Sequence, residues 1–192
     1  MTALAQPGKW EKYFWPLLAG SAFLAVWDVS VRWSGSKVFP SPLDVQNGVA
    51  ELFRRGVLWS YIADSLRRVG IGFSLAALLG IPIGLTLGWY SAAAQVVNPL
   101  IQMLRPISPI AWIPLAIVWF GIGDTAAVYL VFLSAFFPIV VASMNGVRNV
   151  PSMFRQAGRN FGLDPVRLLA RVVFPAALPR IIIGLRLALG IA

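Results

Sequence analysis

Long apolar segments alternate with short polar ones along almost the whole chain. The apolar segments cover about residues 13–31, 63–90, 94–121, 125–146 and 175–192. A helix needs about 20 predominantly apolar residues to cross a bilayer, and these segments approach or exceed that length. The pattern therefore predicts an all-α polytopic membrane protein with about five transmembrane helices, in which residues 1–192 form a single transmembrane domain.

The segment between the first two predicted spans is too polar to cross a membrane and has a helical period of its own. Pro40 and Pro42 favour an extended or turned chain at its start. Within about residues 43–56, the apolar side chains fall on one face, made by Val45, Val49, Leu52 and Phe53. We expect an amphipathic helix that lies on the membrane surface.

A second polar segment, about residues 149–174, predicts two short amphipathic helices joined by a bend. The first helix has an apolar face that recurs every four residues, made by Met153, Ala157 and Phe161. Gly162 is placed to end that helix, because a glycine often follows the last helical residue. Asp164 followed by Pro165 is typical of a helix start, with Asp as the N-cap and Pro at the first helical position.

Positive charge sets the expected orientation. Six arginines and one aspartate lie between residues 148 and 180, and basic loops tend to remain in the cytoplasm. Counting back through the spans places the N-terminus in the cytoplasm as well, in agreement with Lys9 and Lys12. The region 32–68 then becomes external, although it is also basic, with Arg32, Lys37, Arg54, Arg55, Arg67 and Arg68.

The arginines of the second polar segment have two readings. As exposed side chains, they could pair with acidic groups of a partner protein or with anionic lipid headgroups. Alternatively, they mark only the topology. The residues concerned are Arg155, Arg159 and Arg167.

Composition excludes several classes of function. Hydrophobic residues make up 58% of the chain and charged residues 12%, about half the charged share of a soluble domain. The net charge of +9 is therefore a topology signal, and we expect no nucleic-acid partner. The chain has no His and no Cys, which excludes a His-based triad, thiol chemistry and a His-ligated metal site. Since the seven acidic residues are scattered, we expect no catalytic residue, no metal site and no cofactor.

The second predicted span carries a stripe of small residues, Gly80, Gly84 and Gly88. Glycines four residues apart lie on one face of a helix and let a neighbouring helix approach closely. The stripe could pack against a moving helix or a second copy of the chain. Ordinary helix packing within the chain is the alternative that we favour.

The third apolar segment, residues 94–121, cannot be one straight helix because of its four prolines, Pro99, Pro106, Pro109 and Pro114. Transporters place substrate sites at such breaks. Arg105 lies inside this segment, and an intramembrane arginine is a candidate functional residue. One interpretation is that Arg105, with Gln102 and Ser108, lines a pathway for an anionic substrate. The other is that Arg105 extends to the membrane interface or pairs with a backbone carbonyl.

Asp28 is an acidic residue within the first predicted span, and Arg32 follows it by one helical turn. An ion pair at the membrane interface is the reading that we favour. A proton or ion site is the alternative.

The second polar segment also carries a recognisable motif. Gln156-Ala157-Gly158, followed after three residues by Gly162 and after nine more by Val172-Val173-Phe174-Pro175, is similar to the EAA motif of ABC importer permeases. The leading Glu and the second Ala of that motif are Gln156 and Gly158 here. Further stretches resemble the nitrate/sulfonate/taurine-type branch of these permeases: Phe39-Pro40-Ser41-Pro42, Ser65-Leu66-Arg67-Arg68-Val69, Ala111-Trp112-Ile113-Pro114-Leu115 and Trp119-Phe120-Gly121-Ile122-Gly123.

The resemblance implies the permease bundle of a type I ABC importer in the cell (inner or plasma) membrane. In that family the EAA segment is a coupling loop that docks in a groove of a separate ATPase subunit. The positions expected to take part in coupling are Gln156, Ala157, Gly158, Gly162, Asp164, Pro165 and Pro175. The implied partners are a pair of ATPase subunits, a second permease copy as a homodimer, an external substrate-binding protein and the lipid bilayer.

Substrate and energy source follow from the same resemblance. It implies a small, anionic solute such as nitrate, an alkanesulfonate, taurine or bicarbonate. The chain contains no G-x-x-x-x-G-K-[ST] phosphate loop, so we expect ATP hydrolysis in a partner subunit. Related permeases carry one more span, and this chain stops at Ala192 within an apolar run; we expect a truncation before a sixth span. The alternative class is an ion-coupled secondary transporter, which would need inverted repeats and membrane-embedded acidic or His residues.

Overall fold

The computed structural model describes residues 10–35 and 39–192, except for the side chains of residues 11 and 12. Lys9 and Lys37, and the side chain of Lys12, which entered the topology argument above, lie outside the described part. The described residues form helices and connecting turns without a strand. The predicted all-α fold is therefore confirmed.

The chain separates into two compact units, Met1–Ile62 and Ala63–Ala192. The first unit contains α1 (Glu11–Ser34) and α2 (Pro42–Arg54), together with the start of α3 (Leu58–Trp89). Helix α2 forms at the segment predicted to be an amphipathic surface helix, and its location at a membrane surface remains a prediction.

A capping box explains where α2 begins. The Ser41 hydroxyl accepts a hydrogen bond from the Asp44 backbone N–H at 3.2 Å, and the Asp44 carboxylate accepts one from the Ser41 N–H at 2.9 Å. Hydrogen bonds from the Ser41 side chain and backbone to the carboxylate lower the pKa of Asp44. Because the pKa is lowered in the folded state, the stabilisation is present above the ordinary pKa of Asp and is lost as the pH falls through the lowered value.

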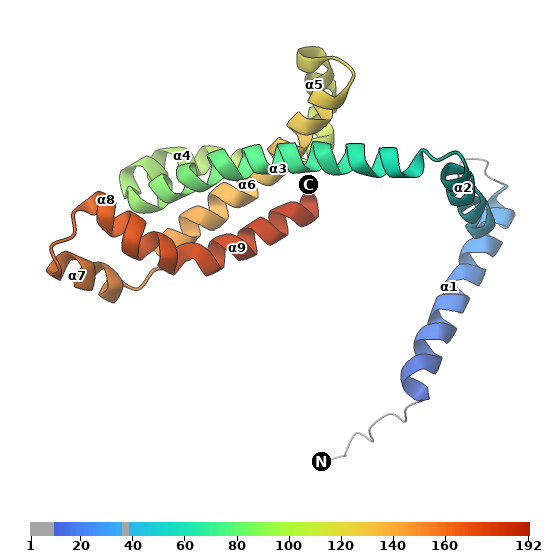
Figure 1. Ribbon diagram of the computed structural model, residues 1–192, viewed down its shortest axis with the longest axis horizontal. Helices are drawn as coiled ribbons and strands as arrows, with labels where there is room; N and C mark the ends of the chain where they lie inside the picture. The colour runs from blue at the N-terminus through green and yellow to red at the C-terminus, as the bar shows by residue number, and fades with distance from the viewer. Residues whose placement is uncertain (1–9, 36–38) are drawn as a thin grey trace. The chain divides into compact units, whose positions relative to one another are not determined.

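The second unit is built around one helix, α6 (Asp124–Arg148). Most of α3 packs along it, as do α4 (Ser91–Leu104) and α9 (Phe174–Ile191) (Figure 1). The shorter elements of this unit are η1 (Pro109–Trp112), α5 (Ile113–Phe120), α7 (Ser152–Asn160), α8 (Pro165–Leu168) and η2 (Leu169–Val173).

Four helical stretches are long and apolar enough to cross a membrane: Tyr13–Ser34, Leu58–Trp89, Asp124–Arg148 and Pro165–Ile191. Two boundaries differ from the prediction. Helix α3 begins at Leu58 rather than near residue 63, and the last stretch continues back through η2 to Pro165 rather than beginning near residue 175. The added residues, 58–62 and 165–174, are mostly apolar, and the only charged residues among them are Arg167 and Arg171.

The third predicted span is broken, as its prolines indicated. Helix α4 ends at Leu104, and the stretch Pro109–Phe120 leaves it at an angle of 89°. Pro106 and Pro109 have no backbone N–H to donate, so a continuous helix cannot pass through this region. Taken as one bent span, this pair is the fifth candidate.

The glycine stripe of α3 packs against α6 of the same chain. A Cβ atom at Gly84 would lie 2.5 Å from both the Ser143 Cβ and the Val140 carbonyl oxygen. The equivalent atom at Gly88 would lie 2.6 Å from the Val147 Cβ, and Gly80 faces Ile139. These positions have no room for a side chain because the two helices approach closely. The structure therefore favours helix packing within the chain over contact of this stripe with a second copy.

A neighbouring face of α6 packs just as closely on α9. A Cβ atom at Gly184 would overlap that of Ala142, and one at Gly146 would lie 3.4 Å from the Ala177 Cβ. The α6–α9 contact also includes residues that are almost completely buried: Val147, Val173, Ala177 and Ile181. Small residues thus hold α6 between α3 and α9.

Ion pairs join α3 to the start of α6. Asp124 accepts from Arg67 at 2.6 Å and from Arg68 at 2.7 Å. The two arginines are therefore partly neutralised by a residue far along the chain. Arg67 and Arg68 are two of the basic residues of region 32–68, which the expected orientation places outside the cytoplasm. Their pairing with Asp124 reduces the positive charge of that region.

We expect Gly84→Ala to destabilise the protein by about 1–3 kcal/mol, because the added methyl group overpacks the α3–α6 contact. Thermal unfolding of the detergent-solubilised protein measures the effect. Gly70→Ala is a matched control in the same helix, since nothing lies within 4 Å of its added Cβ. The control should be neutral or slightly stabilising, because Ala favours a helix over Gly. Equal effects of the two substitutions would contradict the close α3–α6 contact.

Candidate functional site

The arginine-rich segment after α6 folds as the two short helices that its sequence predicts. Helix α7 ends in a Schellman motif, in which the Leu163 N–H donates to the Gly158 carbonyl at 3.1 Å and the Gly162 N–H to the Arg159 carbonyl at 2.9 Å. Gly162 has φ +75°, a left-handed conformation that glycine adopts without a Cβ clash. The bend between α7 and α8 is thus fixed by the backbone.

Helix α8 begins as the Asp-Pro pair predicts. The Asp164 carboxylate accepts from the Arg167 N–H at 3.4 Å and from the Arg167 Nε at 3.2 Å. Pro165 occupies the first turn, where its missing N–H has no helical acceptor to lose. Helix α8 continues through η2, a turn of π-helix, into α9, whose first turn contains Pro175. The segment is therefore continuous with a candidate span.

The two small residues at the centre of α7 face different surroundings. Gly158 is buried, and a Cβ atom there would overlap Leu168 and lie 3.5 Å from Leu163. Ala157 is exposed, as is Gln156. Gly158 therefore allows α7 to pack on α8, whereas Ala157 is free to meet another molecule.

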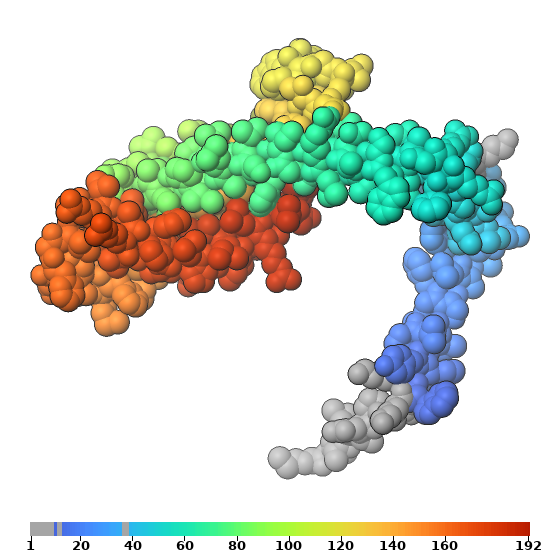
Figure 2. Space-filling model, in the orientation of Figure 1, coloured from blue at the N-terminus to red at the C-terminus, as the bar shows by residue number. Residues whose placement is uncertain are grey.

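The outward surface of this segment carries large apolar side chains. Met153 is 66% exposed, Phe161 87% and Val166 74%. Arg159 and Arg167 are exposed as well, so the surface is both apolar and basic. In Figure 2, α7 and α8 form one end of the second unit. Apolar side chains gathered on a polar segment are typical of an interaction site.

Arg155 corrects one sequence-based expectation. It was expected to be exposed, but it is half-buried, and its guanidinium donates to the Val147 carbonyl at 2.8 Å. Val147 lies in the last turn of α6, where carbonyls lack helical partners. Arg155 therefore ties α7 to the end of α6, and this contact could not be read from a pattern that placed it on the polar face.

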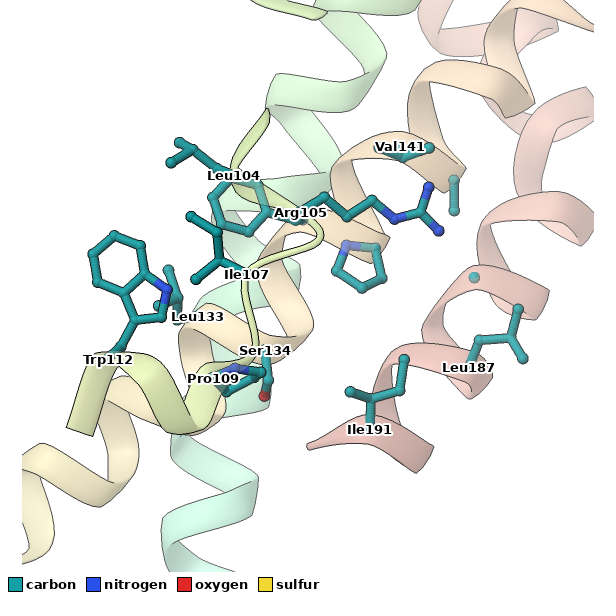
Figure 3. A pocket seen from close by; sticks show the side chains of 14 residues that line it. Leu104, Arg105, Ile107, Pro109, Trp112, Leu133, Ser134, Val141, Leu187 and Ile191 are labelled. Atoms are coloured by element: carbon teal, nitrogen blue, oxygen red, sulfur yellow. The ribbon is translucent and has the colours of Figure 1, made fainter. Parts of the chain in front are cut away.

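A pocket of about 350 Å³ opens beside the break between α4 and η1. Its walls come from α4, η1, α6, α9 and the loop that follows α4. Figure 3 shows the Arg105 side chain extending from that loop, with its guanidinium beside Val141 of α6. Leu187 and Ile191 of α9 lie on another side. The pocket thus joins elements that are distant in the sequence.

Of the three residues predicted to line a pathway, the structure places Arg105 in the pocket. Gln102 and Ser108 are exposed, and neither is among the lining residues. The Ser108 hydroxyl instead accepts from the Ile110 N–H at 3.4 Å and caps η1. Sequence spacing could not show that Ser108 lies outside the pocket, because the chain turns sharply between residues 104 and 109.

Two polar lining residues were missed by the sequence argument for this pocket. Ser134 of α6 lines the wall and donates to the Val131 carbonyl at 2.8 Å. Trp112 of η1 also lines it. Ser134 could have been identified from the sequence, because it is one of the few polar residues in its span. Nothing in the sequence indicates that Trp112 lies near Arg105.

Asp28 and Arg32 form an ion pair with an Nε–Oδ2 distance of 2.7 Å, as the interfacial reading expected. Among residues 10–35 and 39–192, no three acidic side chains lie close enough together to hold a metal ion.

Comparison with known proteins connects this architecture to a family. Residues 80–192 match the family model described as binding-protein-dependent transport system inner membrane component. The chain is 35% identical over 189 residues to the bicarbonate transport system permease protein CmpB of Synechococcus elongatus, covering 92% of this chain and 67% of CmpB.

Two further relatives have different named substrates. The taurine transport system permease protein TauC of Escherichia coli is 35% identical over 72% of this chain and 50% of TauC. The putative aliphatic sulfonates transport permease protein SsuC of Bacillus subtilis is 34% identical over 97% of this chain and 69% of SsuC. The chain spans about half to two thirds of the length of the curated relatives that it matches.

The apolar helices and the family match together define a multi-pass membrane protein of the transporter class. The chain belongs to the family of binding-protein-dependent transport system inner membrane components, and within it to the nitrate/sulfonate/taurine-type branch of ABC transporter permeases. The resemblance found in the sequence is confirmed.

The position of Gly158 generates a test of the fold of the α7–α8 segment. We expect Gly158→Val to speed tryptic cleavage at Arg159 and Arg167 at least fivefold, because overpacking against Leu168 costs about 1–3 kcal/mol. Ala157→Val is the neighbouring control, and its cleavage rate should not change because Ala157 is exposed. Equal cleavage of both variants would show that Gly158 is not an internal packing residue.

Proposed function

We propose that this chain is the pathway-forming subunit of an ATP-driven importer of small anionic solutes, and that residues 149–174 dock on a separate ATPase subunit. The observation that carries the proposal is the α7–α8 segment. It is a rigid, bent pair of helices that follows a candidate span, and it presents exposed apolar and basic side chains. Family membership and the EAA-like residues also support docking of this segment on an ATPase subunit.

The docking surface would be centred on Ala157. Its small side chain lets the backbone of α7 approach a groove closely, while Met153 and Phe161 on the same face offer apolar area. Exposed Arg159 and Arg167 add charge complementarity to acidic groups at the rim. Gln156 lies exposed beside Ala157 and would contact the same groove. Gly158, Gly162, Asp164 and Pro165 would act by shaping the segment, and Pro175 by beginning α9.

The same segment is connected so that it can transmit a movement. Towards the N-terminus, Arg155 links α7 to the last turn of α6. Towards the C-terminus, α8 continues through η2 into α9. Since α6 and α9 pack closely through Gly184 and Ala142, displacement of α7 by a closing ATPase pair would move both helices together. Because η2 continues the helix from α8 into α9 without a break, it would transmit the displacement of α8 to α9.

The family also supports the proposed partners and orientation. The named substrates of the relatives, bicarbonate, taurine and aliphatic sulfonates, support a small anion, and nitrate belongs to the same chemical class. The family's description supports an external substrate-binding protein. The coupling segment would face the cytoplasm, which places the N-terminus there too. A second permease copy would complete the pathway as a homodimer, and ATP hydrolysis would occur in the partner ATPase.

Within the pathway, Arg105 is the residue proposed to attract the anion. It lines the pocket beside the helix break, and an arginine offers several N–H donors to an oxyanion. Gln102 and Ser108 flank the same break and would meet the solute outside this pocket. The alternative of an ion-coupled carrier gains no support from Asp28, since that residue already pairs with Arg32.

We expect Ala157→Arg to abolish copurification of the permease with its ATPase, because a long charged side chain would keep α7 out of the groove. The measurement is affinity purification from membranes that express both proteins. Ala50→Arg, the same change at an exposed position of α2, is the control and should copurify normally. Retained copurification of the Ala157→Arg variant would place the ATPase contact elsewhere.

We expect Arg105→Gln to reduce ATP-driven anion uptake at least tenfold in membrane vesicles, since the pathway would lose its cation. Arg105→Lys, which keeps the charge, should retain part of the uptake. Both variants should still copurify with the ATPase. Uptake by Arg105→Gln equal to that of the unaltered protein would remove Arg105 from the pathway.

A further inference from the structure

The pocket beside the helix break has walls of two chemical kinds. Arg105 is the one charged residue among those that line it, and Ser134 and Trp112 add polar atoms. The other lining residues are apolar or small, and they include Leu133 and Phe137 of α6 and Leu187 and Ile191 of α9. Leu187 and Ile191 lie on another side of the pocket from the Arg105 side chain (Figure 3).

The Arg105 guanidinium is available to a ligand. No acidic side chain of the described residues forms an ion pair with it. A guanidinium donates two parallel N–H bonds to a planar or tetrahedral oxyanion. Arg105 is itself exposed, so an oxyanion can reach its guanidinium from the open side of the pocket. The pocket therefore favours a monoanion at one of its ends.

The size and walls of the pocket constrain the rest of the ligand. Its volume of about 350 Å³ is within the range of small-molecule sites. An inorganic anion comparable to a few water molecules, about 30 Å³ each, would fill only the end near Arg105. The apolar walls on α6 and α9 would then face water. A ligand that carries an apolar group would bury them.

We infer that this pocket is a two-part binding site within the permease for an organic monoanion with a short apolar group. Arg105 binds the anionic end, and the walls formed by Phe137, Leu187 and Ile191 contact the apolar end. The inference rests on the proposed role of the chain in anion import and adds to it that the permease itself selects among anions. It also requires that inorganic anions bind the pocket more weakly than organic ones.

Thiol labelling tests the site directly, because the chain has no native cysteine. Leu187→Cys places a single thiol in the pocket wall, at a side chain that is 63% exposed. Ser91→Cys, exposed at the start of α4 and outside the pocket, is the control. Maleimide labelling is measured in membranes with nitrate, methanesulfonate, propanesulfonate or butanesulfonate as the protecting anion.

We expect all the alkanesulfonates to slow labelling of Leu187→Cys and to leave Ser91→Cys unaffected. The half-protecting concentration should fall roughly two- to fourfold with each added methylene group, because each one buries apolar area. Nitrate should protect least. Addition of Arg105→Gln should raise every half-protecting concentration at least tenfold, and Arg105→Lys should restore much of the protection.

Three results would overturn the inference. Protection that does not depend on the length of the alkyl group would show that the pocket has no apolar subsite. Protection that is unchanged by Arg105→Gln would remove the anionic part, and the absence of protection by any anion would remove both. Labelling is read on the permease whether or not an ATPase copurifies with it. The experiment can therefore disprove anion binding in the pocket without bearing on whether the segment 149–174 docks on an ATPase.

Discussion

Close approach of α6 to its neighbours is the constraint on which the second unit depends. On one side, the glycines of α3 leave no space for a side chain against Val140 and Ser143. On a neighbouring side, Gly184 of α9 lies against Ala142. Within a bilayer, apolar side chains gain little by leaving lipid, so helix association relies on such close van der Waals contact. Helices held this closely slide or separate only as a group, which makes α6 and α9 suitable for transmitting a movement.

The α7–α8 segment connects the end of α6 to the start of η2 and α9. The Schellman motif at Gly162 and the Asp164 cap fix the bend from within, and Gly158 packs the two short helices together. The hydrogen bond from Arg155 then joins α7 to α6. Local sequence thus shapes the segment, while its outward surface, around Ala157 and Phe161, is exposed. The pocket at Arg105 lies against the helix break.

Some of this organisation could be predicted because it depends on neighbouring residues. Apolar length predicted the helices, the prolines predicted the break after α4, and the Gly162 and Asp164-Pro165 signals predicted the bend. The predictions failed where a contact joins distant residues. Nothing near Arg155 in sequence indicates that it would reach the carbonyl of Val147. In the same way, Asp124 pairs with Arg67 and Arg68 across two elements, and the topology rule counted those arginines as free.

The pocket was predictable only in part for the same reason. Arg105 was identified because an arginine in an apolar segment is unusual. Its neighbours Gln102 and Ser108 were grouped with it by sequence distance, but Gln102 is exposed on α4, and the turn after α4 places Ser108 at the start of η1. The residues that share the pocket with Arg105, Ser134 and the wall on α9, come together because α6 and α9 pack as one group.

Distance measurements between pairs of spin labels test the central claim most directly, since the chain lacks cysteine. One pair joins Arg159 on α7 to Ile182 on α9, and a second joins Ile110 on η1 to Ile182; all three side chains are exposed. If α7 and α9 move as one body, the first distance stays constant when ATP binds the assembled transporter and the second changes. A change in the first distance while the second stays fixed would contradict the account.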